Sequence, residues 1–502
     1  MKLKNNSVFI VSLIITLTLV GFGFFVPEKL DVFSSEIHLW IIENCGWAYL
    51  LSTFIFLVFA LFLAMGPYKE IKLGKDEEKP QFTYFGWISM LFAAGMGIGL
   101  IFWGVAEPLN HFQNPPDYLD SKSGAAAMFA MKYSFFHWGF HPWAVYIVMS
   151  LGIAYFSFRR GMRPLISSCF YPLIGDKIFG IPGKTIDVLA VFATVFGIST
   201  SLGLGAMQIH SGLTEVFGLP NEIKYTLLII AVVTFFFIMS SITGLSKGIQ
   251  ILSKANIIIL LILILFMFIA GPTSYILNVF TSTLGNYLSS LVSMSLNLHP
   301  FEGYEWTKSW TVFYWAWWIA WSPFVGLFVA SISRGRTIKE FAFGLLLVPT
   351  LLTFVWFSIF GGAALYIQIE MGQDIASTAV ADISIVLFKL FNYYPFGMGL
   401  SILAVLLLSV FFITSADSAT FVLAMMTSNG NFNPPVAKKL SWGITQSLVA
   451  SVLLVSGGLG ALQKMSIAAA LPFTLILLLL CVSLIKAFNY ELKYERKTHD
   501  PG

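Results

Sequence analysis

Long apolar segments alternate with short polar loops along almost the entire chain. A helix that crosses a hydrocarbon layer of about 30 Å needs about 20 apolar residues. Twelve stretches meet this requirement, near residues 7–26, 45–65, 87–106, 127–157, 186–208, 224–244, 251–271, 309–332, 341–365, 396–425, 440–460 and 466–487. The pattern predicts an all-α membrane protein with twelve transmembrane helices, and an even number of spans places both termini on one side.

The segment between the seventh and eighth spans differs from its neighbours. Residues 274–308 alternate apolar and small polar residues in a helical rhythm, which is typical of an amphipathic helix on the extracytoplasmic membrane surface. Five spans at 87–273 precede it and five spans at 309–487 follow it, as in a five-plus-five inverted repeat. Residues 1–86 hold two further helices and a cytoplasmic loop, and residues 488–502 form a short cytoplasmic tail.

Composition and charge support this interpretation. Hydrophobic residues make up 57% of the 502 residues and charged residues only 11%, which excludes a soluble globular protein. Most Lys and Arg fall on the side of the termini, so the positive-inside rule puts both termini in the cytoplasm of a cell-membrane protein. The net charge of +4 therefore reflects topology and not binding of nucleic acid. The 3 cysteines are too far apart in sequence for a disulfide framework.

The third span contains a run of glycines, AAGMGIGL at 93–100. Gly95, Gly97 and Gly99 each cost about 1 kcal/mol of helix stability relative to alanine, so the helix can open here. Non-helical backbone at membrane depth is tolerated where it lines a cavity or is buried in protein, which predicts a binding element. The alternative is that the glycines only allow close packing of helices, and the sequence favours neither.

Tryptophan is concentrated in the eighth span, WTVFYWAWWIAWSPF at 310–324. At about 100° per residue, one side of this helix is lined by aromatic rings, those of Trp310, Tyr314, Trp317, Trp318 and Trp321. Indole faces carry negative quadrupole potential. Such a wall favours a cation that lacks hydrogen-bond donors, above all a quaternary ammonium.

The fourth span supplies a second aromatic group, FFHWGFHPWAVY at 135–146. Trp138, Trp143 and Tyr146 spread over one side of the helix, and Pro142 can kink it and free a carbonyl. Together the two spans can enclose a small cation from several directions. Aromatic belts at the membrane interfaces are the alternative, but belt residues gather near span ends and the tryptophans of the eighth span are interior.

His137 and His141 are spaced by one helical turn, as half of a metal site would be. No acidic or cysteine ligand accompanies them nearby in the sequence, so we expect polar contacts to neighbouring helices instead. The chain has no P-loop, dinucleotide fingerprint or nucleophile elbow. We predict that it is not an enzyme.

The tenth span carries polar groups in FFITSADSAT at 411–420. The hydroxyls of Thr414 and Ser415 and the carboxylate of Asp417 are costly in hydrocarbon unless they face protein, water or an ion. Hydroxyls and carbonyls are the ligands that hard cations prefer, and an opened glycine stretch would supply carbonyls. A sodium site and plain hydrogen bonding between helices are equally consistent with these residues.

Five segments together resemble the betaine/carnitine/choline transporter family: GMGIGL, FHWGFHPWAVY, SWTVFYWAWWIAWSPF, SRGRT and FFITSADSA. The resemblance covers nearly the whole chain and is greatest to the sodium-coupled glycine betaine carriers. It implies twelve helices, of which helices 3–12 form a LeuT-type inverted repeat, assembled as a homotrimer in the lipid bilayer. It implies sodium as the coupling ion and no cofactor.

The resemblance also implies site residues. The family's aromatic box matches Trp138, Trp143, Tyr146, Trp317, Trp318 and Trp321, beside the backbone of Gly95, Gly97 and Gly99. Its sodium site matches the backbone oxygens of Ala93, Met96 and Phe411 and the hydroxyls of Thr414 and Ser415. A second sodium site of related carriers matches Thr194 and Phe324, but Ile198 stands where a threonine is expected, so Ser199 or Thr200 would have to substitute. The number of sodium ions stays open.

The function implied is sodium-coupled symport of glycine betaine or a related quaternary-ammonium compatible solute for osmoprotection. Choline carriers that resemble this family often have an acidic residue where this chain has Gly99, so glycine betaine is favoured over choline. Carnitine, proline betaine and ectoine share its charge pattern. The alternatives are a sodium-independent carnitine/betaine exchanger, an uptake carrier for choline or ectoine and, in another class, a ligand-gated channel or receptor for quaternary amines.

Overall fold

A computed structural model describes residues 6–95, 97–243 and 246–495 of the chain. In chain order its α-helices are α1 (Ser7–Phe25), α2 (Pro27–Met65), α3 (Tyr84–Gly95), α4 (Ile98–Gln113), α5 (Gly124–Trp138), α6 (Phe140–Ala154), α7 (Tyr171–Ile174), α8 (Ile181–Phe217), α9 (Ile223–Thr243), α10 (Ser246–Ala270), α11 (Thr273–Leu296), α12 (Tyr304–Thr307), α13 (Phe313–Ile332), α14 (Ile338–Ile369), α15 (Ala376–Ala381), α16 (Val386–Phe391), α17 (Gly397–Met426) and α18 (Val436–Tyr490). Short 3-10 or π turns are η2 (Tyr155–Arg159), η3 (Ser167–Phe170), η4 (Gly175–Phe179), η5 (Lys308–Val312) and η6 (Glu491–Glu495). The described residues contain no strand, only an isolated bridge between Lys72 and Thr337, and the all-α prediction is confirmed.

Most of the expected spans correspond to long apolar helices. In the described part of the chain, nine helical segments are long and apolar enough to cross a membrane, or ten if α10 and α11 count as one bent span. The expected span at 87–106 falls across the break between α3 and α4, and the last two expected spans fall within α18. Within the expected surface segment 274–308, α11 is bent by 106° from the end of α10.

Glycines mark the places where long helices break. Gly97 has φ −138° and ψ −178°, an extended conformation that separates α3 from α4. Gly139 interrupts the expected fourth span between α5 and α6. Gly458 in α18 has φ +60°, a left-handed conformation that side chains rarely adopt, and it kinks this helix. The opening predicted from the glycines at 93–100 is therefore present in the backbone.

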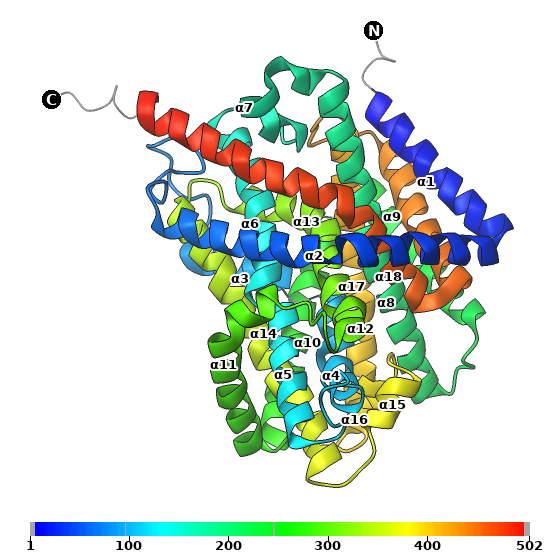
Figure 1. Ribbon diagram of the computed structural model, residues 1–502. Coiled ribbons are helices and arrows are strands. Elements are labelled where there is room, and N and C mark those ends of the chain that lie inside the picture. Colours follow the sequence, from blue (N-terminus) through cyan, green and yellow to red (C-terminus); the bar gives the residue numbers. More distant parts are fainter. Residues whose placement is uncertain (1–5, 96, 244–245, 496–502) are drawn as a thin grey trace.

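Small residues let the central helices approach one another closely. A Cβ atom on Gly197 of α8 would lie 2.9 Å from the backbone nitrogen of Trp321 in α13. A Cβ atom on Gly326 of α13 would lie 2.4 Å from the Cγ of Met149 in α6. Helices α6, α8 and α13 thus form a tight central group, which α14 and α18 flank (Figure 1).

The residues expected as a tail from 488 onward continue the last helix instead of leaving it. Helix α18 runs to Tyr490, and η6 extends the coil to Glu495. The Glu491 side chain is fully buried, and its carboxylate pairs with Arg159 at 2.6 Å and accepts a hydrogen bond from the hydroxyl of Tyr155 at 2.7 Å. This pair fastens the end of α18 to η2.

We expect Arg159→Ala to destabilise the protein by about 3–5 kcal/mol, because it leaves the Glu491 carboxylate buried without its cation. Heat- or denaturant-induced unfolding in detergent, followed by circular dichroism, measures the loss. Lys224→Ala is the control, since Lys224 and Glu222 form an exposed ion pair worth at most about 1 kcal/mol. Equal shifts in the two variants would contradict the structural role assigned to Arg159.

Candidate substrate-binding site

The broken helices surround a cavity in the interior of the protein. Its lining comes from seven helices and the break before α4, and consists of Gly97, Ile98, Gly99, Leu100, Trp138, Pro142, Trp143, Tyr146, Ser201, Trp317, Trp318, Trp321, Thr353 and Ser415. Eight of the nine substrate-binding candidates from the sequence are among them, namely Trp138, Trp143, Tyr146, Trp317, Trp318, Trp321, Gly97 and Gly99. The structure therefore brings the aromatic groups of the fourth and eighth spans together beside the glycine break. Gly95 is the last residue of α3, at that break.

The break between α5 and α6 orients two of these rings. Pro142 has no N–H, so the carbonyl of Trp138 lacks its usual donor four residues later, and the hydroxyl of Thr353 donates to it at 3.0 Å. The neighbouring carbonyl of His137 accepts from Nε1 of Trp318 at 2.9 Å. The kink expected from Pro142 is thus centred at Gly139, and the carbonyls beside it hold α13 and α14 in place.

The rings of the cavity meet at steep angles. Trp138 lies at 77° to Trp318 with ring centroids 4.8 Å apart, and at 88° to Trp317 with centroids 6.2 Å apart. Tyr146 lies at 81° to Trp318 and 78° to Trp143. Trp317 and Trp318 stack on each other at 4.6 Å. The arrangement forms two walls and not a ring of parallel plates.

The polar atoms of the cavity differ in whether they are already bonded. Nε1 of Trp138 and Nε1 of Trp318 donate to protein acceptors. Among the described residues, Nε1 of Trp317, Nε1 of Trp321 and the hydroxyl of Tyr146 are buried without a hydrogen-bond partner. Buried donors of this kind are costly unless a ligand or water meets them. The cavity therefore offers both apolar ring faces and free donors.

Not every tryptophan of the expected wall reaches the cavity. Trp310 is not among the lining residues; its ring packs against Trp103 at 5.5 Å and against His111 at 4.4 Å. The π-helical turn η5 (Lys308–Val312) contains Trp310 and ends just before α13, so the register of a regular helix does not extend from residue 310 onward. Trp310 still shares a side with Tyr314, whose ring stacks on it at 6.5 Å, but neither of these two residues lines the cavity.

Gly99 is required by the close approach of the rings. A Cβ atom at this position would lie 2.6 Å from Cη2 of Trp317 and 3.1 Å from Cη2 of Trp138. A Cβ atom on Gly97 would meet nothing within 4 Å. The two glycines of this motif therefore have different roles, since only Gly99 is crowded by the aromatic rings.

The described residues matched to the family's sodium site lie on α3, just before the break, and on α17. Ser415 of α17 lines the cavity together with Gly97 and Gly99. The hydroxyl of Thr414 donates to the carbonyls of Val410 and Phe411 within its own helix. Ala93 belongs to the last turn of α3, and Met96 lies outside the described residues.

The residues matched to a second sodium site are less well placed to bind an ion. Thr194 of α8 is buried and its hydroxyl donates to the carbonyl of Ala190 at 2.7 Å, whereas Phe324 lies on α13. The two hydroxyls that would replace the missing threonine face α18. Ser199 donates to the carbonyl of Gln446, and Thr200 is bonded to Leu462 and Ser466.

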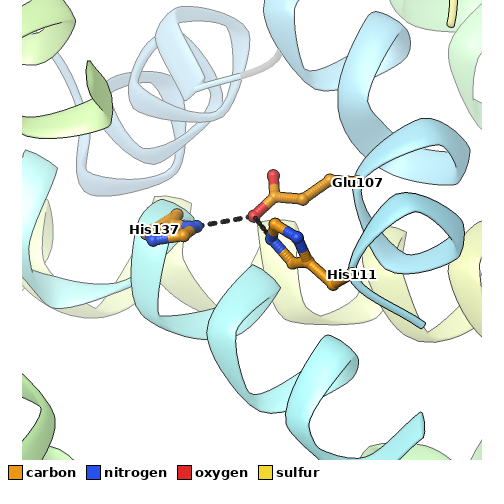
Figure 2. Close-up of side chains that lie close together, drawn as sticks. All are labelled: Glu107, His111 and His137. Carbon is orange, nitrogen blue, oxygen red and sulfur yellow. Dashed lines mark hydrogen bonds and ion pairs between the residues drawn. The ribbon is translucent and has the colours of Figure 1, made fainter. Parts of the chain in front are cut away.

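A buried acidic side chain behind the cavity was not expected from the sequence. Glu107 of α4 is fully buried, and Oε1 is 2.7 Å from Nδ1 of His137 and 3.2 Å from Nε2 of His111 (Figure 2). Its Oε2 accepts from Nε1 of Trp138 at 2.9 Å and from the hydroxyl of Tyr314. The hydrophobic pattern ended the third span at 106, one residue too early to reveal an ionisable group at membrane depth.

The same three side chains are of the types that bind metal ions. Ligand atoms of Glu107, His111 and His137 lie within 4.8 Å of one another. Oε1 is already the shared partner of both rings and Oε2 is held by two donors, so hydrogen bonds satisfy the carboxylate, whereas Nδ1 of His111 is buried without a partner among the described residues. The polar contacts expected for the histidines are confirmed: His137 also contacts Thr311, and His141 contacts Ser295.

Comparison with known proteins gives the site a context. Residues 7–493 match the model of the BCCT family, described as betaine/carnitine/choline family transporter. The chain belongs to the betaine/carnitine/choline transporter family. The resemblance inferred from the five segments is confirmed, and because the family and its members are transporters, so is the prediction that the chain is not an enzyme.

Relatives within the betaine/carnitine/choline transporter family match over most of their length. The glycine betaine transporter OpuD of Bacillus subtilis is 49% identical, covering 98% of this chain and 96% of the relative. An ectoine/hydroxyectoine transporter of Virgibacillus pantothenticus is 44% identical, covering 97% of each chain. A glycine betaine/proline/choline/ectoine transporter of Vibrio parahaemolyticus is 41% identical, covering 91% of this chain and 82% of the relative.

Gly99→Ala should raise the KM for uptake of glycine betaine, the solute named for the Bacillus relative, by about tenfold or more, because the new methyl group displaces the Trp317 and Trp138 rings. Uptake of radiolabelled solute into proteoliposomes measures it. Gly97→Ala is the matched control, since its methyl group meets open space, and it should stay within about twofold. A similar loss in both variants would show that backbone freedom, and not ring approach, is what the motif supplies.

Proposed function

We propose that this transporter couples the inward movement of sodium to the uptake of glycine betaine, as a compatible solute for osmoprotection. The observation that carries the proposal is the cavity itself. It combines indole faces with the first turn of a helix, two features that suit the opposite charges of a small zwitterion. The relatives' names include glycine betaine, which fits this chemistry.

The trimethylammonium group would lie among the aromatic rings. A quaternary nitrogen cannot donate a hydrogen bond, so it gains little from a hydroxyl or carbonyl but is attracted by the faces of Trp and Tyr. Trp138, Trp143 and Trp318 are at most 5% exposed, and Tyr146 and Trp317 are buried as well. In a dry site this attraction is worth about 2 kcal/mol or more per well-placed ring.

The carboxylate would lie at the start of α4. The first amide groups of a helix lack intrahelical acceptors and sit at the positive end of its dipole, which favours an anion. Gly97 caps α4, and Ile98, Gly99 and Leu100 of its first turn line the cavity. The free Nε1 of Trp317 and Trp321 and the hydroxyl of Tyr146 are additional donors. Both ends of the substrate would thus be met without a charged side chain in the cavity.

The wider architecture that we propose follows the family resemblance. Counting α3 with α4 as one broken span and α18 as two spans gives twelve, with the last ten forming a LeuT-type inverted repeat that rocks around the fixed site. The start of α1 and the end of α18 lie at the same, upper end of the molecule (Figure 1), which supports positions on one side of the membrane, and the positive-inside rule favours the cytoplasm. We further propose a homotrimer.

Trp318→Leu should abolish at least 90% of glycine betaine uptake in proteoliposomes, because the ring that faces Trp138 and the bond to His137 are both lost. The control is Trp40→Leu, which removes an indole that is 60% exposed on α2 and should transport normally. Unaltered uptake by the Trp318 variant would refute the assignment of these aromatic rings, here called the cage, to binding of the ammonium group. A panel of choline, carnitine, proline and ectoine as competitors ranks the solutes in the same assay.

Uptake should require sodium and fail when potassium replaces it. Ser415→Ala should raise the sodium concentration for half-maximal uptake by about tenfold, because it removes an oxygen ligand beside the break. Ser409→Ala is the control, since this hydroxyl lies on the same helix and is bonded to the carbonyl of Val405. Uptake that persists in potassium and follows an imposed pH gradient would contradict sodium coupling.

The accumulation ratio at equilibrium reports how many sodium ions enter per cycle. One ion moving through ~100 mV and a tenfold gradient supplies about 3.7 kcal/mol, enough for roughly 500-fold accumulation of a neutral zwitterion. A second ion would square this ratio. The bonded state of Ser199 and Thr200 supports one ion.

A further inference from the structure

The carboxylate of Glu107 lies at the edge of the Trp138 ring, outside the cavity lining. It does not line the cavity, but it is joined to Trp138 by the hydrogen bond from Nε1 at 2.9 Å. Its side chain is fully buried. A single ionisable group held this deep in the bundle is costly and calls for a reason.

The contacts indicate that Glu107 is ionised. Indole Nε1 can only donate, so Oε2 is an acceptor, and the hydroxyl of Tyr314 donates to the same oxygen. Oε1 faces one ring nitrogen each of His111 and His137. Two donors at Oε2 and two imidazole nitrogens at Oε1 match the acceptor capacity of a carboxylate. In the described part of the chain the ionisable groups paired with it are these histidines alone, with no Lys or Arg.

A donated N–H changes the ring that donates it. When Nε1–H of Trp138 points at a negatively charged oxygen, electron density moves into the indole and its face becomes more negative. The face of a polarised indole attracts a cation more strongly than the face of an unbonded one. Trp138 is also the ring that stands at steep angles to both Trp317 and Trp318, so it forms the wall opposite them.

We propose that Glu107 is a positioning residue of the cage and the countercharge of the bound ammonium group, acting through Trp138. The inference rests on the proposed substrate and names what gives the cage its preference for a positive nitrogen. The carboxylate fixes the rings of Trp138 and Tyr314 and adds a negative field to the site. It stays out of the cavity, where it would repel the substrate's own carboxylate.

The test compares two ligands of the same shape. Glycine betaine and 3,3-dimethylbutanoate differ only in the charged nitrogen that the second replaces with carbon. Glu107→Gln should raise the KM of glycine betaine at least tenfold and change inhibition by 3,3-dimethylbutanoate less than twofold. An equal loss for both ligands would overturn the proposal, since it would show that Glu107 only supports the fold.

Charge-retaining and uncharged controls complete the experiment. Glu107→Asp keeps the charge and should keep the KM of glycine betaine within about threefold; a loss as large as that of the Gln variant would overturn the proposal. Thr311→Val removes the other partner of His137 and should affect neither ligand by more than threefold. Should Glu107→Gln fail to reach the membrane, Trp138→Phe removes the same hydrogen bond by changing the donor instead of the acceptor. It removes the N–H donor, and a selective loss of betaine over its carbon isostere is again the expected result.

Failure of this inference can be told apart from failure of the proposed function. If Trp318→Leu abolishes uptake while Glu107→Gln weakens both ligands equally, the cage stands and only the role of Glu107 falls. If Trp318→Leu transports normally, the cage itself falls, whatever the Glu107 variants do.

Discussion

The site depends on hydrogen bonds that a broken helix makes available. Between α5 and α6 the chain has Gly139 and, three residues later, Pro142, so the carbonyls of His137 and Trp138 turn to other helices for donors. One donor is the indole of Trp318 and the other is the hydroxyl of Thr353. Because unpaired carbonyls at membrane depth are costly, these bonds hold α13 and α14 at a set distance from the break. The break in the helix at Gly139 therefore determines where the Trp318 ring lies.

The two breaks that face the cavity have complementary consequences. At the break before α4, the chain exposes the amide end of a new helix, which is positive. At Gly139 the chain exposes carbonyls, and these are consumed by side chains that belong to the cage. The cavity thus combines the start of a helix with aromatic rings that lie directly beside it. An unbroken helix would provide neither free amides nor free carbonyls at this depth.

Much of this could be predicted from the sequence, and the failures have physical causes. The apolar periodicity located the helices, and the cost of three glycines indicated that the helix can open within 93–100, because both effects are local; that it opens at Gly97 is seen only in the structure. Helical angles grouped Trp317, Trp318 and Trp321, which line the cavity, with Trp310 and Tyr314, which do not, because an angle around a helix does not say how far along its axis a cavity extends. Glu107 was missed because its burial is set by α5 and α13, which come from distant parts of the chain. Hydrophobicity along one segment does not contain that information.

The positions of Gly99 and Glu107 together suggest how a cage of this kind suits a zwitterion. A carboxylate at position 99 would crowd Trp317 and Trp138, since even a Cβ atom there lies 2.6 Å from the first ring. It would also lie beside the amides of α4 and compete with the carboxylate of the substrate. A carboxylate at Glu107 reaches the cage only through the N–H of Trp138, so it favours the ammonium group while the ring keeps it apart from the substrate's anion. Under the proposed function, moving the negative charge from the lining to the layer behind it separates recognition of a betaine from recognition of a simple cation.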